Sequence, residues 1–249
     1  MQSIAIANYL KANNRKRRRV ELQQKNSIAV IIPIFNEEET IPVTISQLTE
    51  LDMALEIYVV DDGSTDHSLE RIKKSNARVI VHPANLGQWA ALRTGFSVAL
   101  SNGAKTFVSI DGDGQHDPAD LPKLVEPIIK NEADLVIGSR FLNETSPEMY
   151  VYRSLGIKIF NRILDMTANI KLTDCTSGYR AYSAELLRKT LPFLRENQFG
   201  ALEFLMCVAR NKARILEVPV KSKHNPKSKK GSLRYGYNLT RTIIKELFR

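Results

Sequence analysis

The sequence predicts an α/β protein built on one mostly parallel twisted sheet with helices on both faces. Short apolar runs rich in Val and Ile alternate with segments of helical periodicity, which is typical of parallel sheets. The chain has 249 residues, 43% of them hydrophobic and 25% charged, which suffices for one large domain with a substantial core. Acidic residues follow two of the runs directly, at the strand ends where open α/β sheets bind ligands.

Five apolar runs are the predicted strands. They span residues 27–35, 56–62, 77–83, 105–113 and 133–140, and as a group they are rich in β-branched residues. Continuous apolar runs of this length, without regular polar alternation, are expected of strands that are buried on both faces. The runs therefore predict a sheet that is covered on both sides.

Amphipathic patterns fill the intervals between these strands. The first predicted helix covers about residues 39–50, a second follows Asp66, and a third runs from about 88 to 100. A fourth begins at Asp117-Pro118, because Asp is a favoured N-cap residue and Pro is favoured at the first helical position.

Positive charge is concentrated in two segments. The net charge is +9, and the excess lies in residues 11–20 and 221–234. Such segregation indicates an anionic partner, which is a nucleic acid, a phosphorylated ligand or an acidic lipid. We expect the first segment to be a mobile, solvated tail and the second to contact that partner. We divide the chain into a basic N-terminal extension (1–26), one domain (27–236) and a C-terminal amphipathic helix (237–249).

Several classes of site and location are disfavoured by the sequence. No run is long and apolar enough to span a membrane, and the N-terminus lacks the charge order of a secretory signal. Cys175 and Cys207 form no CxxC pair, so we expect them to be packing residues in a reduced compartment. No GxGxxG, GxxxxGK[ST] or HExxH motif is present. These features favour a cytoplasmic protein without a dinucleotide, P-loop or zincin site.

Two acidic clusters follow predicted strands. The first is Asp61 and Asp62, and the second contains Asp111, Asp113 and Gln115. Turn and helix-cap chemistry is sufficient to explain either cluster alone. Converging carboxylates, however, raise one another's pKa unless a cation lies between them. Mg²⁺ and Mn²⁺ take oxygen ligands and bridge one or two carboxylates to substrate phosphates, so the two clusters together predict a divalent metal site.

Six motifs, in sequence order, resemble those of a known family. Together they resemble the family 2 glycosyltransferases of GT-A fold, and most of all the dolichyl-phosphate or polyprenyl-phosphate mannose synthases, over about residues 27–236. The resemblance implies a Rossmann-like nucleotide-diphospho-sugar transferase domain and metal-dependent, inverting transfer of mannose from GDP-mannose to a polyprenyl phosphate. The motifs are VIIPIFNEEETI (30–41), VVDDGSTD (59–66), NLGQWAALRTGF (85–96), SIDGDGQHDP (109–118), VIGSRF (136–141) and DCTSGYRAYS (174–183).

The resemblance also implies a donor site. Asp111 and Asp113 match the DxD motif of the family and are implied to be catalytic. Asp113 and Gln115 would be direct ligands of Mg²⁺ or Mn²⁺, and Asp111 would contact the nucleotide sugar or a metal-bound water. The residues implied to bind the nucleotide are Pro33, Phe35, Glu37 and Asp62, together with Asp111.

A lipid phosphate acceptor requires positive charge rather than a general base, because it is largely anionic near neutral pH. Arg140 and Arg180 are therefore candidate catalytic residues, and for both, as for Arg153, the alternative is an ion pair with a neighbouring acid. The basic loop 221–236 departs from the family pattern, and it is either a flexible lid or a solvated connector. The candidates for binding the acceptor phosphate or the donor diphosphate are Arg140, Arg153, Arg180, His224, Lys229 and Lys230.

Glu203 interrupts an otherwise apolar helical pattern. A buried acid is costly unless it is paired, so we expect Glu203 either to face the cleft or to be half exposed near Arg210 or Lys212. In family members with hydroxyl acceptors an acid from this region serves as the base. Glu203 is therefore the candidate base if the acceptor is a glycan hydroxyl.

A polyprenyl acceptor implies contact with a membrane surface. Segments 150–170 and 235–249 are basic and amphipathic, so they are either interfacial helices or core-packing helices. We expect peripheral attachment to the cytoplasmic face of a membrane, with or without a separate membrane protein. Two alternatives stay open: a UDP-hexose donor or glycan hydroxyl acceptor, and, in another class, a basic nucleic-acid-binding protein. The lack of aromatic residues among the Lys runs disfavours nucleic acid as a partner.

Overall fold

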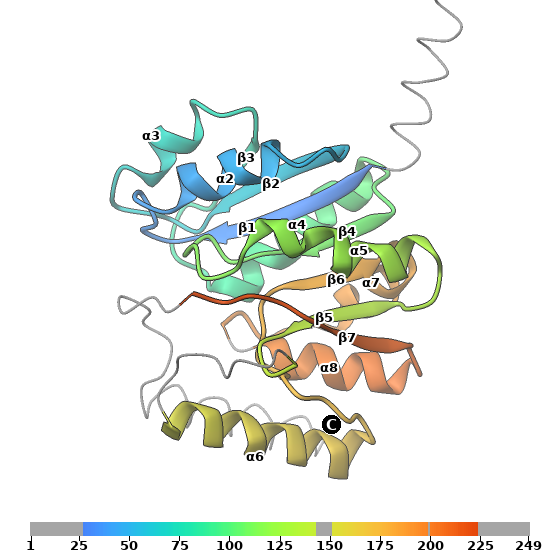
Figure 1. Ribbon diagram of the computed structural model, residues 1–249. Helices are drawn as coiled ribbons and strands as arrows, with labels where there is room; N and C mark the ends of the chain where they lie inside the picture. Colours follow the sequence, from blue (N-terminus) through green and yellow to red (C-terminus); the bar gives the residue numbers. More distant parts are fainter. Residues whose placement is uncertain (1–26, 143–150, 199, 224–249) are drawn as a thin grey trace, which may run out of the picture.

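A seven-stranded mixed sheet lies at the centre of the part of the chain that the structure describes (Figure 1). This computed structural model describes residues 27–142, 151–198 and 200–223, without the side chains of 151–155. The strand order is β3-β2-β1-β4-β6-β5-β7. Neighbouring strands are parallel except where β6 pairs with β4 and β5. The strands are β1 (Ile28–Ile34), β2 (Leu55–Asp61), β3 (Arg78–Val81), β4 (Thr106–Ser109), β5 (Leu135–Ser139), β6 (Arg180–Ser183) and β7 (Ile215–Pro219).

Helices cover both faces of this sheet. Every residue of β1 is buried, and its side chains alternate between two core clusters, with Val30 and Ile32 in one and Ala29 and Ile31 in the other. Apolar residues of α2, α3 and α5 complete the first cluster, whereas α4, α6, α7 and α8 contribute to the second. The helices are α2 (Ile41–Thr49), α3 (Ser68–Ile72), α4 (Gln88–Ser101), η1 (Pro118–Asp120), α5 (Leu121–Ile129), α6 (Val151–Ala168), α7 (Ala184–Thr190), η2 (Leu191–Phe193) and α8 (Gly200–Arg210).

The carboxyl ends of β1, β2 and β4 lie at the same edge of the sheet, because these strands are parallel and adjacent. Hydrogen bonds connect the loops that follow the first two strands. The backbone N–H of Asn36 donates to Ser64 Oγ at 3.0 Å, and that of Glu37 donates to Ser68 Oγ at 2.8 Å. The segment after β1 is thereby fixed against the segment after β2, and the two form one wall of a pocket.

The fold class predicted from the sequence is confirmed. Each predicted strand is present, and the predicted helices correspond to α2, α3, α4 and the pair η1 and α5. Asp117 is an N-cap as expected, since its side chain accepts a hydrogen bond from Ala119 N at 3.0 Å. The strand predicted at 105–113 ends at Ser109. The chain then forms the loop that carries Asp111, Asp113 and Gln115, which we call the acidic loop. Two further strands, β6 and β7, were not predicted from the sequence.

Three further predictions from the sequence concern residues 150–170, 1–26 and 237–249. Residues 150–170 were predicted to be helical, and α6 forms there. Residues 1–26 and 237–249 lie outside the described residues, so the domain boundaries stay predictions. Among the helices that the structure describes, none combines the length and apolar character that a membrane crossing requires.

Candidate functional site

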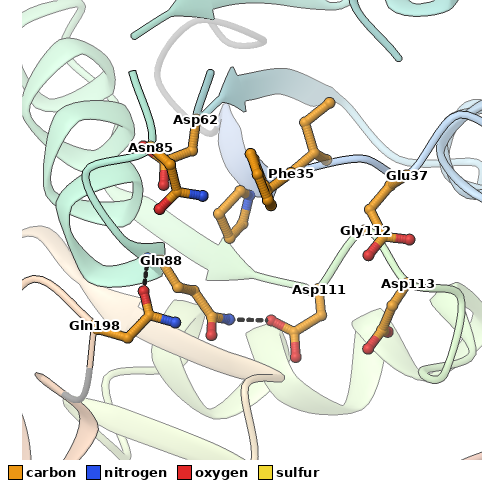
Figure 2. Close-up of a pocket in the computed structure, with 11 residues that line it drawn as sticks. Phe35, Glu37, Asp62, Asn85, Gln88, Asp111, Gly112, Asp113 and Gln198 are labelled. Atoms are coloured by element: carbon orange, nitrogen blue, oxygen red, sulfur yellow. Dashed lines mark hydrogen bonds between the residues drawn. The ribbon is translucent and has the colours of Figure 1, made fainter. Parts of the chain in front are cut away.

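A pocket opens where β1, β2 and β4 end, and side chains from five segments face it (Figure 2). The segments are the end of β1 with its following loop, the end of β2, the approach to α4, the acidic loop after β4, and the segment before α8. The lining residues are Pro33, Ile34, Phe35, Glu37, Asp62, Asn85, Gln88, Asp111, Gly112, Asp113 and Gln198.

Asp62, at the end of β2, holds the loop that leads into α4. Its carboxylate accepts hydrogen bonds from Leu86 N at 3.0 Å and Gly87 N at 2.8 Å. His82 Nδ1 lies 2.7 Å from the same carboxylate, while His82 Nε2 lies 3.0 Å from Thr94 Oγ1 on α4. Asp62 and His82 are both buried, so Asp62 organises the loop as well as lining the pocket.

Gly87 allows this loop to pass close to another segment of the chain. Its φ of 107° is unfavourable for residues with a side chain, and a Cβ atom there would lie 2.6 Å from the carbonyl oxygen of Asn197. The close approach brings the segment before α8 against the first turn of α4. Gln88 N then donates to Gln198 Oε1 at 3.1 Å.

Asp111 is held from two sides. Gln88 Nε2 donates to Asp111 Oδ1 at 2.6 Å, which Figure 2 shows as a dashed line across the pocket. On the other side, a Cβ atom built on Gly178 would lie 2.7 Å from Asp111 Oδ2. The absence of a side chain at position 178 therefore leaves the space that this carboxylate occupies.

Asp111, Asp113 and Glu37 lie around one side of the pocket (Figure 2). Asp113 Oδ1 accepts a hydrogen bond from Gln115 N at 3.1 Å, and Glu37 Oε2 accepts one from Thr40 Oγ1 at 2.9 Å. In the described part of the chain no group of three or more His, Cys, Asp or Glu side chains forms a complete metal cage. Two carboxylates on one loop fit a Mg²⁺ or Mn²⁺ ion that completes its shell with phosphate oxygens and water.

The pocket unites most of the residues predicted to bind the donor. Pro33, Phe35, Glu37 and Asp62 line it together with Asp111 and Asp113. Gln115, which was predicted to be a metal ligand, is buried and is not among the residues that line the pocket. Its Nε2 atom has no hydrogen-bond partner within the described structure. Its role as a metal ligand stays a prediction.

Arg140 does not reach the pocket, because its guanidinium group is paired with Asp174. Arg140 Nε donates to Asp174 Oδ2 at 2.7 Å and Nη2 donates to Oδ1 at 2.8 Å, with both residues buried. Burial alone would raise the pKa of Asp174, but the charge and hydrogen bonds of Arg140 outweigh it and hold the pKa below its ordinary value. The ion pair considered as the alternative is therefore present.

Arg180, at the start of β6, is also buried and holds backbone carbonyls. Its Nε donates to Ser177 O at 2.8 Å and its Nη2 donates to Cys175 O at 2.7 Å. Nη1 has no hydrogen-bond partner in the described structure. Arg180 thus shapes the 175–178 turn behind Asp111, and the acid partner considered for it is not among these contacts. Cys175 is a buried packing residue as expected, and burial raises its pKa to about 12.

Glu203, on α8, adopts neither of the two arrangements expected from the sequence. It is buried and accepts three hydrogen bonds from the backbone N–H groups of Arg195 and Glu196, at 2.8 to 3.0 Å. It does not line the pocket. The remaining predicted contacts, made by the side chain of Arg153 and by His224, Lys229 and Lys230, lie outside the described residues.

Three polar residues of the pocket were not singled out in the sequence. Asn85 and Gln88 lie in the motif NLGQWAALRTGF, so the motif gave a signal without indicating their roles. Gln198 gave no local signal, because it meets Gln88 across 110 positions of sequence.

Comparisons with known proteins place the chain beside transferases of sugars. The family model described as Glycosyl transferase family 2 matches residues 29–191. A UDP-N-acetylglucosamine–dolichyl-phosphate N-acetylglucosaminyltransferase of Methanococcus voltae is 32% identical, over 78% of this chain and 85% of that protein. An undecaprenyl-phosphate mannosyltransferase of Micrococcus luteus is also 32% identical, over 78% of this chain and 82% of that protein.

A solved structure has the same fold. Glucosyl-3-phosphoglycerate synthase from Mycobacterium tuberculosis, in complex with Mn²⁺, UDP and phosphoglyceric acid, superposes with a TM-score of 0.69 at 23% identity. The match covers 89% of this chain and 78% of that one. At this level of identity the likeness concerns the fold.

Proposed function

The chain belongs to glycosyl transferase family 2, and from this premise we propose that it transfers a hexose from a nucleotide diphosphate sugar to a polyprenyl phosphate. The observation that carries the proposal is the meeting of Asp111 and Asp113 with Phe35 and Glu37 in one pocket at the carboxyl edge of the sheet. The polyprenyl acceptor is supported by the names of two relatives, which specify dolichyl or undecaprenyl phosphate. The match to this chain extends over most of the length of each relative.

Mannose from GDP-mannose is the donor that we propose first. It is supported by the motifs of the sequence and by the mannosyltransferase name of one relative. A UDP-hexose is the second candidate, and one observation favours it: an equally similar relative is named for UDP-N-acetylglucosamine. The pocket accepts either as a class, since Phe35 and Pro33 offer apolar surface to a base and Glu37 offers an acceptor for hydroxyl or amine groups.

The proposed metal is Mg²⁺ or Mn²⁺, which Asp113 and Asp111 would hold. When bound, the ion supplies charge that stabilises the diphosphate leaving group. Gln88 keeps the carboxylate of Asp111 turned into the pocket through the 2.6 Å hydrogen bond. Asp62 keeps Gln88 in place, because it fixes the residues that precede α4. In the proposed inverting displacement, an oxygen of the acceptor phosphate forms a bond to the anomeric carbon while the bond from that carbon to the diphosphate oxygen breaks, and the nucleoside diphosphate leaves.

A lipid phosphate acceptor does not require a general base. Its second ionisation lies near pH 6 by analogy with phosphorylated side chains, so it is substantially anionic when it binds. The burial of Glu203 away from the pocket is consistent with this acceptor and weighs against a hydroxyl acceptor that uses Glu203 as base. Lys229, Lys230 and His224 remain proposed ligands of the phosphate.

The protein must work at a membrane surface, because exposing a polyprenyl chain to water costs about 0.8 kcal/mol per CH₂ group. The outer side of α6 is suited to such contact. Ile159 is 51% exposed and Met166 is 74% exposed, and Lys158 and Arg162 are exposed beside them. We propose peripheral attachment on the cytoplasmic face, alone or through a separate membrane protein.

The test is transfer of labelled sugar into lipid. Purified protein is incubated with polyprenyl phosphate in vesicles, Mn²⁺ or Mg²⁺, and a panel of labelled GDP- and UDP-hexoses, and organic-extractable label is counted. We expect acid-labile lipid label that requires the metal and is highest with GDP-mannose. Label that appears only with a UDP-hexose identifies the second candidate donor. Absence of lipid label with every donor, together with transfer to a glycan hydroxyl, contradicts the proposed acceptor.

A further inference from the structure

Glu203 is a buried charge with an unusual set of partners. Only 1% of its surface is exposed. Its two carboxylate oxygens accept hydrogen bonds from Arg195 N, at 3.0 and 2.9 Å, and from Glu196 N, at 2.8 Å. Hydrogen bonds to a charged acceptor are among the stronger ones in proteins, and a buried carboxylate is costly without them. Glu203 therefore fixes the backbone of the segment 194–198, which precedes α8.

The segment 194–198 supplies hydrogen-bond acceptors to the N-terminus of α4. The first N–H groups of a helix have no partner within the helix, and the N-cap residue Gly87 offers no side chain. The carbonyl of Asn197 accepts from Trp89 N at 2.7 Å and from Ala90 N at 3.1 Å. Gln198 Oε1 accepts from Gln88 N at 3.1 Å. The 194–198 segment thus satisfies three consecutive donors at the start of α4.

A second contact prevents the segment from sliding along α4. Arg93, on the next turn of α4, donates to Leu194 O at 2.6 Å and also to the side chain of Asn197. The position of the first turn of α4 is therefore tied to that of residues 194–198.

The first turn of α4 in turn controls the pocket. Gln88 is its first residue, and its side chain donates to Asp111 Oδ1 at 2.6 Å. Gln88 and Gln198 both line the pocket, and Figure 2 shows Gln88 between Gln198 and Asp111. A shift of residues 194–198 would move Gln88 and release the carboxylate that faces the donor.

We propose that Glu203 is a positioning residue for the donor site and not a base. Its carboxylate holds residues 194–198, these cap α4, and the cap orients Gln88 against Asp111. This inference rests on the proposed function in one respect, namely that the pocket containing Asp111 binds a nucleoside diphosphate with a metal ion. The coupling between Glu203 and α4 does not depend on that ligand.

Trp89 is a natural fluorescent probe of the contact between α4 and residues 194–198. It is the only tryptophan of the chain. Its ring centroid lies 5.5 Å from that of Phe204, the neighbour of Glu203, and a Cβ atom at Gly200 would lie 2.8 Å from Trp89 Cγ. Its backbone N–H is one of those that Asn197 caps. Loosening of the segment 194–198 should therefore increase the quenching of Trp89 fluorescence by acrylamide without any ligand present.

The experiment compares the full chain with Glu203→Gln and Gln198→Ala. The amide keeps the shape of Glu203 but loses the charge and one acceptor oxygen. Gln198→Ala leaves α8 unchanged and removes the acceptor for Gln88 N. Because Gln198 also lines the pocket, Trp89 quenching without nucleotide is the measure of coupling in this variant. The matched control is Glu185→Gln, since Glu185 is an exposed acid on α7 that pairs with Lys189. Trp89 quenching is measured on each protein, followed by titration with GDP or UDP in the presence of Mn²⁺.

We expect both variants to increase Trp89 quenching and to raise the Kd of the nucleotide with Mn²⁺ about 10-fold, the change that corresponds to loss of one hydrogen bond to a charged group. Combining the two substitutions should raise Kd by less than the product of the single effects, because both act on the same segment. The pH profile of transfer should keep its shape in Glu203→Gln, and the control should match the wild type.

The opposite pattern would overturn the proposal. If Glu203 were a base, Glu203→Gln would leave Trp89 quenching and nucleotide Kd unchanged, lower kcat by about 10²-fold to 10⁴-fold, and remove the ascending limb of the pH profile. Unchanged quenching and Kd in both variants also refute it. A wild-type protein that binds neither nucleotide with Mn²⁺ refutes the proposed function, yet greater quenching in Glu203→Gln would still support the coupling to α4.

Discussion

Replacing Gly178 by Ala tests whether the position of Asp111 determines activity. The added methyl group would lie 2.7 Å from Asp111 Oδ2, 2.9 Å from Oδ1 and 3.0 Å from Cγ. Ordinary contact begins at 3.4 Å, so the carboxylate must move by about 0.7 Å, and a misplacement near 1 Å costs on the order of 100-fold in rate. The atoms that clash belong to the end of a side chain, which is able to rotate away without moving the backbone.

We therefore expect Gly178→Ala to lower kcat/KM about 100-fold and to raise the Mn²⁺ concentration needed for half-maximal rate. Thermal unfolding should stay close to that of the wild type. The matched control is Gly156→Ala in α6, where no described atom beyond the helix's own backbone and the two chain neighbours lies within 4 Å of the added Cβ, and a helical Ala is favourable. A wild-type kcat/KM in Gly178→Ala would refute the claim that the position of Asp111 determines activity. A loss of activity that is fully explained by unfolding at a lower Tm would refute it as well.

Further predictions concern the metal ligand and the buried ion pair. Asp113→Ala should abolish transfer while circular dichroism and Tm stay near wild type, and near-normal turnover would contradict the metal assignment. Arg140→Ala leaves Asp174 buried without its partner and should lower the free energy of unfolding by about 3–5 kcal/mol in urea titrations; an unchanged stability with a raised acceptor KM would instead support phosphate binding. Because the folded-state pKa of Asp174 is held below 3.8, its stabilisation is present above that pH and is lost as the pH falls through the lower folded value. The acid-induced loss of stability that this pair causes should disappear in Arg140→Ala.

Local signals were sufficient for much of the fold. β-branched runs predicted β1 to β5, because strands buried on both faces need continuous apolar sequence. β6 has four residues, of which Arg180 and Ser183 are polar, and its place between β4 and β5 comes from antiparallel pairing with both. That pairing is tertiary, so no local pattern predicted it. The GT-A fold implied by the six motifs is confirmed by the topology and by the structural relative.

The site was predicted where its residues follow strand ends and missed where distant segments meet. Asp62 follows β2 and Asp111 follows β4, two strands that lie parallel on either side of β1, so their convergence follows from topology. The partner of Arg140 lies 34 positions away, and Gln198 meets Gln88 across 110 positions. Glu203 was expected to find a side-chain partner or the cleft, but backbone N–H groups satisfy it. Sequence patterns do not indicate which backbone groups a folded chain leaves free for capping.

The central claim is that Asp111 and Asp113 share a divalent ion with a nucleoside diphosphate in the pocket beside Phe35. A crystal structure of the protein grown with GDP and Mn²⁺, with the ion located by its anomalous signal, tests it most directly. We predict one strong manganese peak within coordination distance of Asp113 and of the diphosphate, with the base against Phe35. A peak bound elsewhere, or GDP bound outside this pocket, would contradict the claim.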